Sequence, residues 1–181
     1  MVKAWTIWFT GLHGSGKSTI AENLAEILRK RNIPLVLLDG DELRKTISSD
    51  LGYSIKDRNE HMKRVVELCK HVNDNGILAI ACVASPTRQS REYAKKIIKN
   101  LFLAYVKCPL DICEKRDVKG HYKKARKKEK GFENFVGINL PFEEPKNADI
   151  ALNTDKEKII ESVSKLLKKL EDKKIIQNAK H

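Results

Sequence analysis

The residues with the clearest chemical purpose lie between Gly11 and Thr19, in the run GLHGSGKST. Gly11, Gly16, Lys17 and Ser18 satisfy the spacing G-x-x-x-x-G-K-[ST] of a phosphate-binding loop, or P-loop. Glycines let backbone N–H groups converge on phosphate oxygens, Lys17 adds positive charge, and the Ser18 hydroxyl is a ligand for Mg²⁺. A glycine-rich turn that only caps a helix is the alternative. We predict a nucleoside triphosphate site formed by Gly11, Gly14, Ser15, Gly16, Lys17, Ser18 and Thr19.

A pair of carboxylates follows the second apolar run, in LLDGDELR. If that run is a strand, Asp39 and Asp41 share a sheet edge with the P-loop. There a carboxylate can take the proton of an acceptor hydroxyl or organise Mg²⁺, although either residue could instead cap the next helix. The third apolar run ends in Ser85-Pro86 without an acidic residue, and no Asn-Lys-x-Asp motif occurs. The pattern therefore favours a small-molecule kinase over a motor ATPase or a GTPase.

Apolar runs alternate with segments of helical period, which predicts an α/β fold. The three-layer P-loop NTPase architecture, with a mainly parallel sheet and a mobile lid, fits this order. The predicted strands are 4–10, 34–38, 77–84, 101–107 and, more weakly, 150–152. The predicted helices are 17–31, 57–75, 87–99, 109–116 and 156–176. In the last helix we expect the stripe of Ile159, Ile160, Val163, Leu166, Leu167 and Leu170 to pack in the core.

The composition sets the class of protein. With 181 residues and 41% hydrophobic content, the chain is long enough for one domain, residues 1–181. No signal peptide or membrane span is evident, which predicts a cytoplasmic protein. Four cysteines without C-x-x-C spacing are expected to be buried free thiols; they are Cys69, Cys82, Cys108 and Cys113.

The formal charge of +12 suits either nucleic acid or a polyanionic small substrate. Nucleic acid binding is disfavoured because no aromatic interleaving or recognised motif accompanies the basic residues. The stretch 119–145 is basic and punctuated by glycines, with no clear strand and little periodicity. A long loop of this kind is usually functional or disordered, and a solvated surface loop is the alternative.

Several sequence blocks together resemble the adenylylsulfate (APS) kinases. In family order they are FTGLHGSGKSTIA, LLDGDELR, DLGYSIKDRNEH, ASPTRQSR, CEKRDVKGHYKKAR, FVGI and PFEEP, between Trp8 and Thr154. The resemblance implies transfer of the γ-phosphate of ATP to the ribose 3′-hydroxyl of APS. The products would be PAPS (3′-phosphoadenylylsulfate) and ADP, in sulfate activation, with Mg²⁺ as cofactor. The resemblance also suggests a homodimer.

The resemblance also assigns roles to residues. Asp41 is implied to be the catalytic or hydroxyl-orienting carboxylate, with Asp39 close to the metal and phosphates. Arg44 and Arg58 would hold the phosphosulfate, for which planar, permanently charged guanidinium groups are suited. Two aromatic rings would stack on the adenine of APS; they are Tyr53 and Phe135.

Further assignments concern the lid and the loop after the third strand. Ser85 matches a position that is regarded as a phosphoserine in the family. Arg116 is implied to pack on the adenine of ATP. Lys119, Lys123 and Arg126 fall in a lid, about residues 117–145, that would close over both nucleotides. The implied catalytic residues are Lys17, Asp41 and Ser85, and Ser18 and Asp39 would hold the metal. The implied substrate-binding residues are Asp39, Asp41, Arg44, Tyr53, Arg58, His61, Ala84, Ser85, Lys119, Lys123 and Phe135.

The chain also departs from the family pattern. His61 and Glu42 each stand where the family usually has asparagine, and His13 replaces a small residue of the P-loop. Two residues are added between Arg126 and Phe135. We expect His13 to point to solvent. Glu42 and His61 keep open a kinase for another small hydroxyl acceptor, and a nucleotide-binding regulator without activity is a further alternative.

Overall fold

The computed structural model describes residues 4–117 and 119–177. Its centre is a sheet of five strands, all parallel, in the order β2-β3-β1-β4-β5. Every residue of the central strands β1 and β3 is buried, which is why both are continuous apolar runs. The predicted parallel sheet is confirmed. Its strands are β1 (Thr6–Thr10), β2 (Leu35–Asp39), β3 (Leu78–Cys82), β4 (Leu101–Lys107) and β5 (Ile150–Asn153).

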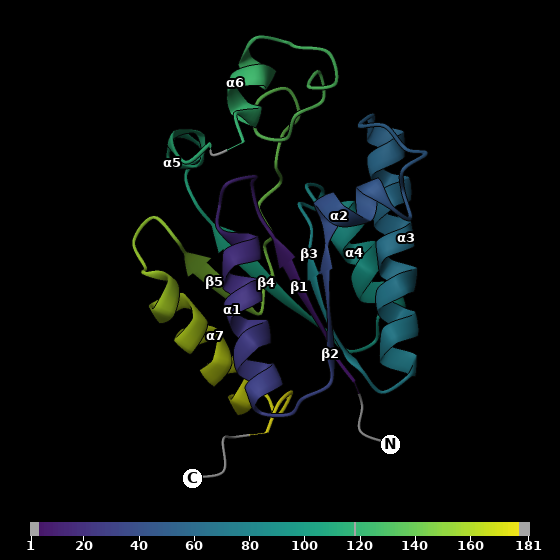
Figure 1. Cartoon of the computed structure of the whole chain (residues 1–181), viewed down its shortest axis with the longest axis vertical. Helices are drawn as coiled ribbons and strands as arrows, with labels where there is room; N and C mark the ends of the chain where they lie inside the picture. Colours follow the sequence, from purple (N-terminus) through teal and green to yellow (C-terminus); the bar gives the residue numbers. More distant parts are fainter. Residues whose placement is uncertain (1–3, 118, 178–181) are drawn as a thin grey trace.

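Helices cover both faces of this sheet (Figure 1). The helices α1 (Lys17–Lys30) and α7 (Ile159–Asp172) lie together on one face, and α3 (Ile55–Asp74) and α4 (Arg88–Ile97) lie on the other. Side chains of β1 alternate between the two cores, since Ile7 and Phe9 join the α1 side and Trp8 joins the α3 side. The predicted three-layer architecture is thereby confirmed.

Two short helices were not predicted from the sequence. The helix α2 (Gly40–Lys45) follows β2 directly, and α6 (His121–Arg126) lies inside the stretch expected to be a loop. Each has six residues, which is too short for a helical period to stand out. A further short helix, α5 (Leu110–Lys115), lies within the predicted helix 109–116.

The C-terminal helix corrects two expectations. It spans residues 159–172 rather than 156–176. Val163, Leu166 and Leu170 are buried as expected, but Ile159 and Ile160 are 51% and 64% exposed. The helix begins only at Ile159, so these two residues form its exposed first turn.

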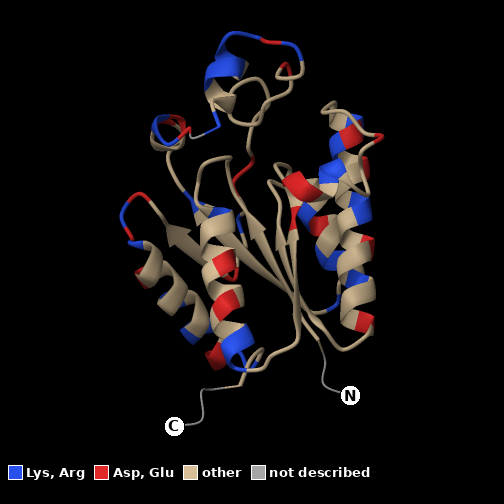
Figure 2. Ribbon diagram, viewed as in Figure 1, with Lys and Arg blue, Asp and Glu red and all other residues tan. Residues whose placement is uncertain are grey.

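The carboxyl ends of the parallel strands meet at one edge, and the loops that follow them gather there (Figure 1). The segment that carries α6 arches above this edge. Figure 2 shows Lys and Arg concentrated on α6 and the chain that follows it, so the segment above the sheet edge is positively charged. In the described ranges no helix is long and apolar enough to cross a membrane.

Candidate active site

The P-loop joins β1 to α1, and its glycines have geometries that other residues would not tolerate. Gly11 has a φ of +149°, and a Cβ there would lie 2.4 Å from the carbonyl oxygen of Val106. Gly14 has a φ of +72°, and its Cβ would lie 3.0 Å from the carbonyl oxygen of Cys113. Gly16, with a φ of +97°, is the N-cap of α1. The loop is therefore a tight backbone turn that ends at a helix N-terminus, the geometry of an anion site.

Lys17 lies within this loop. Its Nζ donates to the carbonyl oxygens of Gly11 at 3.0 Å and Leu12 at 2.6 Å. Burial lowers the pKa of Lys17 from its ordinary value. The ammonium group is thus held across the loop by backbone oxygens, beside the N-terminus of α1.

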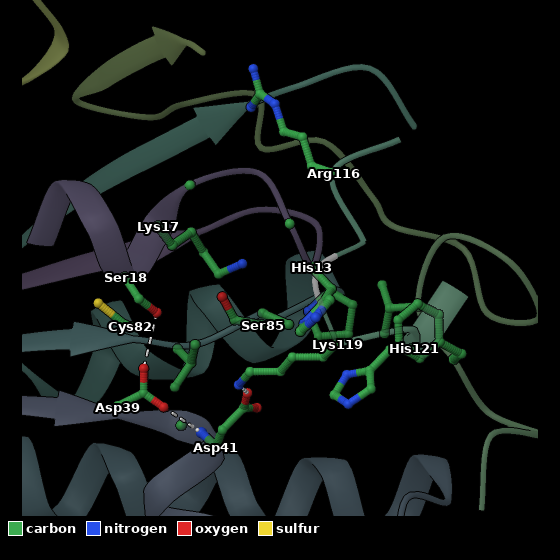
Figure 3. Close-up of a pocket in the computed structure, with 18 of the residues that line it drawn as sticks. His13, Lys17, Ser18, Asp39, Asp41, Cys82, Ser85, Arg116, Lys119 and His121 are labelled. Atoms are coloured by element: carbon green, nitrogen blue, oxygen red, sulfur yellow. Dashed lines mark hydrogen bonds and ion pairs between the residues drawn. The ribbon is translucent and has the colours of Figure 1, made fainter. Parts of the chain in front are cut away.

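Asp39 both caps a helix and faces the P-loop. One of its oxygens accepts from the backbone N–H groups of Asp41 at 2.8 Å and Glu42 at 3.3 Å, which starts α2. Its other oxygen accepts from the Ser18 hydroxyl at 3.0 Å (Figure 3). A hydroxyl and a carboxylate side by side fit Mg²⁺, which prefers hard oxygen ligands and completes its shell with phosphates and water. Helix capping and metal binding would therefore use different oxygens of the Asp39 carboxylate, so the two roles are compatible.

The Asp41 carboxylate does not cap the helix. It faces the cavity, where the Lys119 Nζ of the segment above approaches it to 3.4 Å (Figure 3). Its side chain is 56% exposed. Glu42, one residue further, pairs with Lys45 at 2.6 Å and does not line the cavity. The Glu42 carboxylate, which had kept open a different phosphate acceptor, therefore points away from the site.

Arg44, Tyr53 and Arg58 form one cluster between α2 and α3. The Arg44 and Arg58 guanidinium carbons lie 4.6 Å and 5.4 Å from the centroid of the Tyr53 ring. Burial, followed by the charge of Arg44, lowers the pKa of Arg58 to about 10. In the described part of the chain neither guanidinium has a carboxylate partner within ion-pair distance. Two converging cations without acidic partners make a site for an anion.

His61 lies beneath this cluster and is 3% exposed. Its Nδ1 lies 2.9 Å from the Ser48 hydroxyl, a hydrogen bond that leaves Nε2 for a ligand. Burial, together with Arg44 and Arg58, lowers the pKa of His61 to about 4. The ring is therefore neutral near pH 7, as the asparagine of the family pattern would be.

Ser85 follows β3 in a strained, fully buried position with a φ of +36°. Its hydroxyl donates to the Thr10 hydroxyl at 2.9 Å and accepts from the indole N–H of Trp8 at 3.1 Å. The carbonyl oxygen of Ala84 accepts from the same Thr10 hydroxyl at 2.8 Å. Neither partner of Ser85 is a base, so the geometry ties this loop to β1.

The PFEEP segment, residues 141–145, anchors the end of the lid to the loop after β3. The Glu143 N–H donates to the carbonyl oxygen of Pro86 at 2.8 Å, and the Arg88 N–H donates to the Glu143 carboxylate at 2.6 Å. The buried Arg91 donates to the Glu143 carbonyl oxygen as well. Glu143 therefore holds one end of this segment at the sheet edge, and the ion pair of Glu144 with Lys107 at 3.2 Å adds a second contact there.

The other end of the lid contacts both β5 and the P-loop. Arg116 Nη2 donates to the carbonyl oxygen of Thr154 at 2.7 Å, and the Thr154 hydroxyl donates to the carbonyl oxygen of Ser15 at 2.7 Å. Arg116 lies away from the Asp41 side of the site (Figure 3). Lys123 is exposed on α6 and does not line the cavity.

The expectation that His13 points to solvent is wrong. Its ring centroid lies 4.8 Å from that of His121 and 5.8 Å from that of Phe135, both in the lid. Burial, followed by the charges of Lys17 and His121, lowers its pKa to about 4. The segment 119–145 covers His13, and this contact could not be predicted because the two parts lie far apart along the chain.

These residues enclose a cavity of about 1390 Å³, larger than the ~300–1,000 Å³ usual for one small ligand. Most of the predicted site residues line it. The exceptions are Gly11, Ser15 and Lys123. Two groups of the residues that were missed come from the lid and from the chain after β5; they include His121, Phe132, Asn134, Thr154, Glu157, Lys158 and Ile159. The position of β5 in a parallel sheet could have indicated the second group, since its carboxyl end reaches the same edge.

The fold and the cavity define a class of protein. A P-loop after β1 and two aspartates after β2 share one cavity with two arginines that have no carboxylate partner in the described part of the chain. Such an arrangement can hold a nucleotide and a second, anionic substrate with a carboxylate between them. This is the site of a P-loop phosphotransferase.

Comparison with known proteins identifies the family. The adenylylsulphate kinase family model matches residues 3–153. An adenylyl-sulfate kinase of Bacteroides thetaiotaomicron is 50% identical over 163 residues, covering 89% of this chain and 80% of the relative. The structure of the APS kinase CysC of Mycobacterium tuberculosis in complex with AMPPNP and APS superposes with a TM-score of 0.88 at 36% identity, covering 93% of this chain and 98% of that one. A hexameric APS kinase from Thiobacillus denitrificans has a TM-score of 0.73 at 27% identity, covering 97% of this chain and 30% of that one.

The chain belongs to the adenylylsulfate kinase family. It is a kinase that phosphorylates APS with ATP, giving PAPS and ADP. The two alternatives, a kinase for another acceptor and an inactive regulator, are not favoured.

Proposed function

We propose that the two substrates occupy opposite arms of the cavity and meet at Asp41. The ATP phosphates lie on the P-loop, with the adenine against Arg116. The APS phosphosulfate lies at Arg44 and Arg58, with its adenine between Tyr53 and Phe135. The observation that carries this assignment is that Arg44 and Arg58, which have no carboxylate partner among the described residues, share one cavity with the P-loop.

Mg²⁺ would be held by Ser18 and Asp39, whose oxygens lie 3.0 Å apart beside Lys17. Bound there, Mg²⁺ supplies positive charge that offsets the charge of the phosphate oxygens during transfer. Asp39 keeps its second oxygen on the N–H groups of α2, so the cap fixes the orientation of the carboxylate.

Asp41 is proposed to accept the proton of the 3′-hydroxyl and to orient its oxygen toward the γ-phosphate. The carboxylate is free of helix capping and faces the cavity. Lys17 and Lys119 stand on either side of this region and would neutralise the transferring phosphoryl group. Lys123 would contribute only if the lid moved closer, and its role stays a prediction.

Ser85 is proposed to act by holding its loop rather than by carrying a phosphoryl group. A serine nucleophile needs an adjacent base, and the hydroxyl contacts Thr10 and Trp8 instead. Direct in-line transfer from ATP to APS needs no phosphoenzyme. The lid, residues 117–145, would limit ATP hydrolysis by excluding water from the cavity.

The assignment of Arg58 can be tested by calorimetric titration with APS. Loss of a charge-assisted hydrogen bond reduces the binding free energy by about 1.5–3 kcal/mol, which is about 10- to 150-fold in affinity. Arg58→Gln should weaken APS binding by this factor and leave the affinity for an ATP analogue unchanged. Arg64→Gln is the matched control, because Arg64 lies on the same helix, pairs with Asp50 at 2.5 Å and does not line the cavity. Equal APS affinity in both variants would contradict the assignment.

Two further expectations stay predictions. The homodimer suggested by the family resemblance is testable by analytical ultracentrifugation. A cytoplasmic location fits the four cysteines, all of which are buried and free.

A further inference from the structure

His13 has no role in the mechanism above, although it lies in the P-loop and lines the cavity. Its carbonyl oxygen accepts a hydrogen bond from the Tyr122 hydroxyl at 2.8 Å. Its ring lies against His121 and Phe135, and Figure 3 shows it between Lys17 and the lid. A single P-loop residue therefore contacts the lid through both its backbone and its side chain.

We propose that His13 is a positioning residue that couples ATP binding on the P-loop to APS binding at Phe135. The inference rests on the proposed role of Phe135 as one of the two rings that stack on the adenine of APS. It goes beyond that role because His13 itself belongs to the ATP side of the site.

The contacts of Phe135 explain how the coupling would work. The centroid of its ring lies 5.8 Å from that of His13 and 5.0 Å from that of Tyr122, in edge-to-face arrangements with interplanar angles of 68° and 78°. Tyr122 is fully buried and is itself bonded to His13. The orientation of Phe135 therefore depends on the position of His13, both directly and through Tyr122.

The other side of His13 is the phosphate site. His13 is flanked by Leu12, whose carbonyl oxygen holds the Lys17 ammonium group, and by Gly14, which lines the cavity. Phosphates bound to the loop would order this backbone and, with it, the ring that supports Phe135. APS would then meet a Phe135 that is already ordered, so less ordering entropy would be lost on binding.

The chemistry of the ring suits this role. Lys17, Lys119, His121 and Asp41 are the charged or titratable groups that face it. Burial and the charges of Lys17, His121 and Lys119 lower its pKa and outweigh the opposite effect of Asp41, so the imidazole is neutral near pH 7. A neutral ring can pack against Phe135 as an aromatic group. A small side chain at position 13, as the family pattern has, would leave this face of Phe135 unsupported.

The test is calorimetric titration of the full chain with APS, with and without a saturating non-hydrolysable ATP analogue and Mg²⁺. The ratio of the two APS dissociation constants is the coupling factor, and the same factor must appear when the order of ligands is reversed. His13→Ser should reduce this factor by about 2- to 12-fold, the equivalent of one aromatic contact of about 0.5–1.5 kcal/mol. His13→Phe should restore it, and the control His71→Ser, an exposed histidine of α3, should leave it unchanged.

Phe135→Leu distinguishes the proposed role of Phe135 in APS binding from the proposed coupling through His13. If this variant binds APS as tightly as the wild type, the proposed role of Phe135 fails and the inference fails with it. If Phe135→Leu weakens APS binding but His13→Ser keeps the wild-type coupling factor, the inference alone is overturned. Equal weakening of APS and ATP-analogue binding by His13→Ser, with an unchanged factor, would also overturn it, because that is the signature of a merely structural role.

Discussion

Replacing Asp41 by asparagine should remove catalysis while leaving the fold and ATP binding in place. The asparagine keeps the size of the side chain but cannot accept the proton of the 3′-hydroxyl. General base catalysis contributes about 10²- to 10⁴-fold, so we expect kcat to fall by about that factor.

The structure limits other effects of this change. The Asp41 carboxylate caps no helix, and its ion pair with Lys119 at 3.4 Å joins side chains that are 56% and 59% exposed. Exposed pairs of this kind contribute at most about 1 kcal/mol, which corresponds to about 2–4 °C in Tm for a chain of this size. Asp41→Asn should therefore melt within a few degrees of the wild type.

The assay is PAPS formation at saturating ATP and APS, with the affinity for an ATP analogue measured alongside. Glu42→Gln is the matched control, since Glu42 is the next residue of α2, pairs with Lys45 and lies outside the cavity. It should keep wild-type kcat. Equal turnover by Asp41→Asn and the wild type would refute the catalytic assignment, and a large loss of ATP affinity would show that Asp41 acts in nucleotide binding instead.

Other perturbations test the remaining parts of the site. Lys17→Ala should weaken ATP-analogue binding by about tenfold or more, since a charge-assisted contact to phosphate is lost; calorimetry checks this, and unchanged affinity would contradict it. Ser85→Ala should lower Tm, because the indole N–H of Trp8 loses its partner, yet keep kcat within about threefold; loss of turnover in a folded variant would support a phosphoserine instead. His61 has a folded pKa of about 4, below the ordinary 6.5, so the unfolded chain binds more protons between these values and stability falls as the pH drops from about 6.5 toward 4. His61→Asn should reduce that fall in denaturant titrations, whereas an unchanged pH profile would show that His61 does not contribute to it.

Local patterns predicted much of the fold and of the site. The strands of the sheet were predictable because buried parallel strands are continuous apolar runs. The P-loop was predictable because its chemistry depends on Gly11, Gly16, Lys17 and Ser18 at fixed spacing within nine residues. The free, buried state of the four cysteines also followed from their spacing and apolar surroundings.

The parts of the site that could not be predicted depend mainly on contacts between distant parts of the chain. His13 is covered by His121 and Phe135, more than a hundred residues further along. The direction of Glu42 is a local exception, because it depends on pairing with Lys45, three residues further along the same helix, which the sequence did not reveal among many charged neighbours. Ile159 lines the cavity only because β5 carries the chain to the shared sheet edge.

The proposal on which the others depend is that Arg44 and Arg58 recognise APS through its phosphosulfate. Its most direct test is phosphate transfer from γ-labelled ATP with Mg²⁺, comparing APS, AMP, adenosine and no acceptor, in the wild type and in Arg58→Gln. We predict that the wild type places label in PAPS in strong preference to the other products, and that Arg58→Gln loses about 10- to 150-fold of its preference for APS over adenosine. A preference for APS that is the same in both proteins, or wild-type label that appears mainly in another acceptor, would contradict the account.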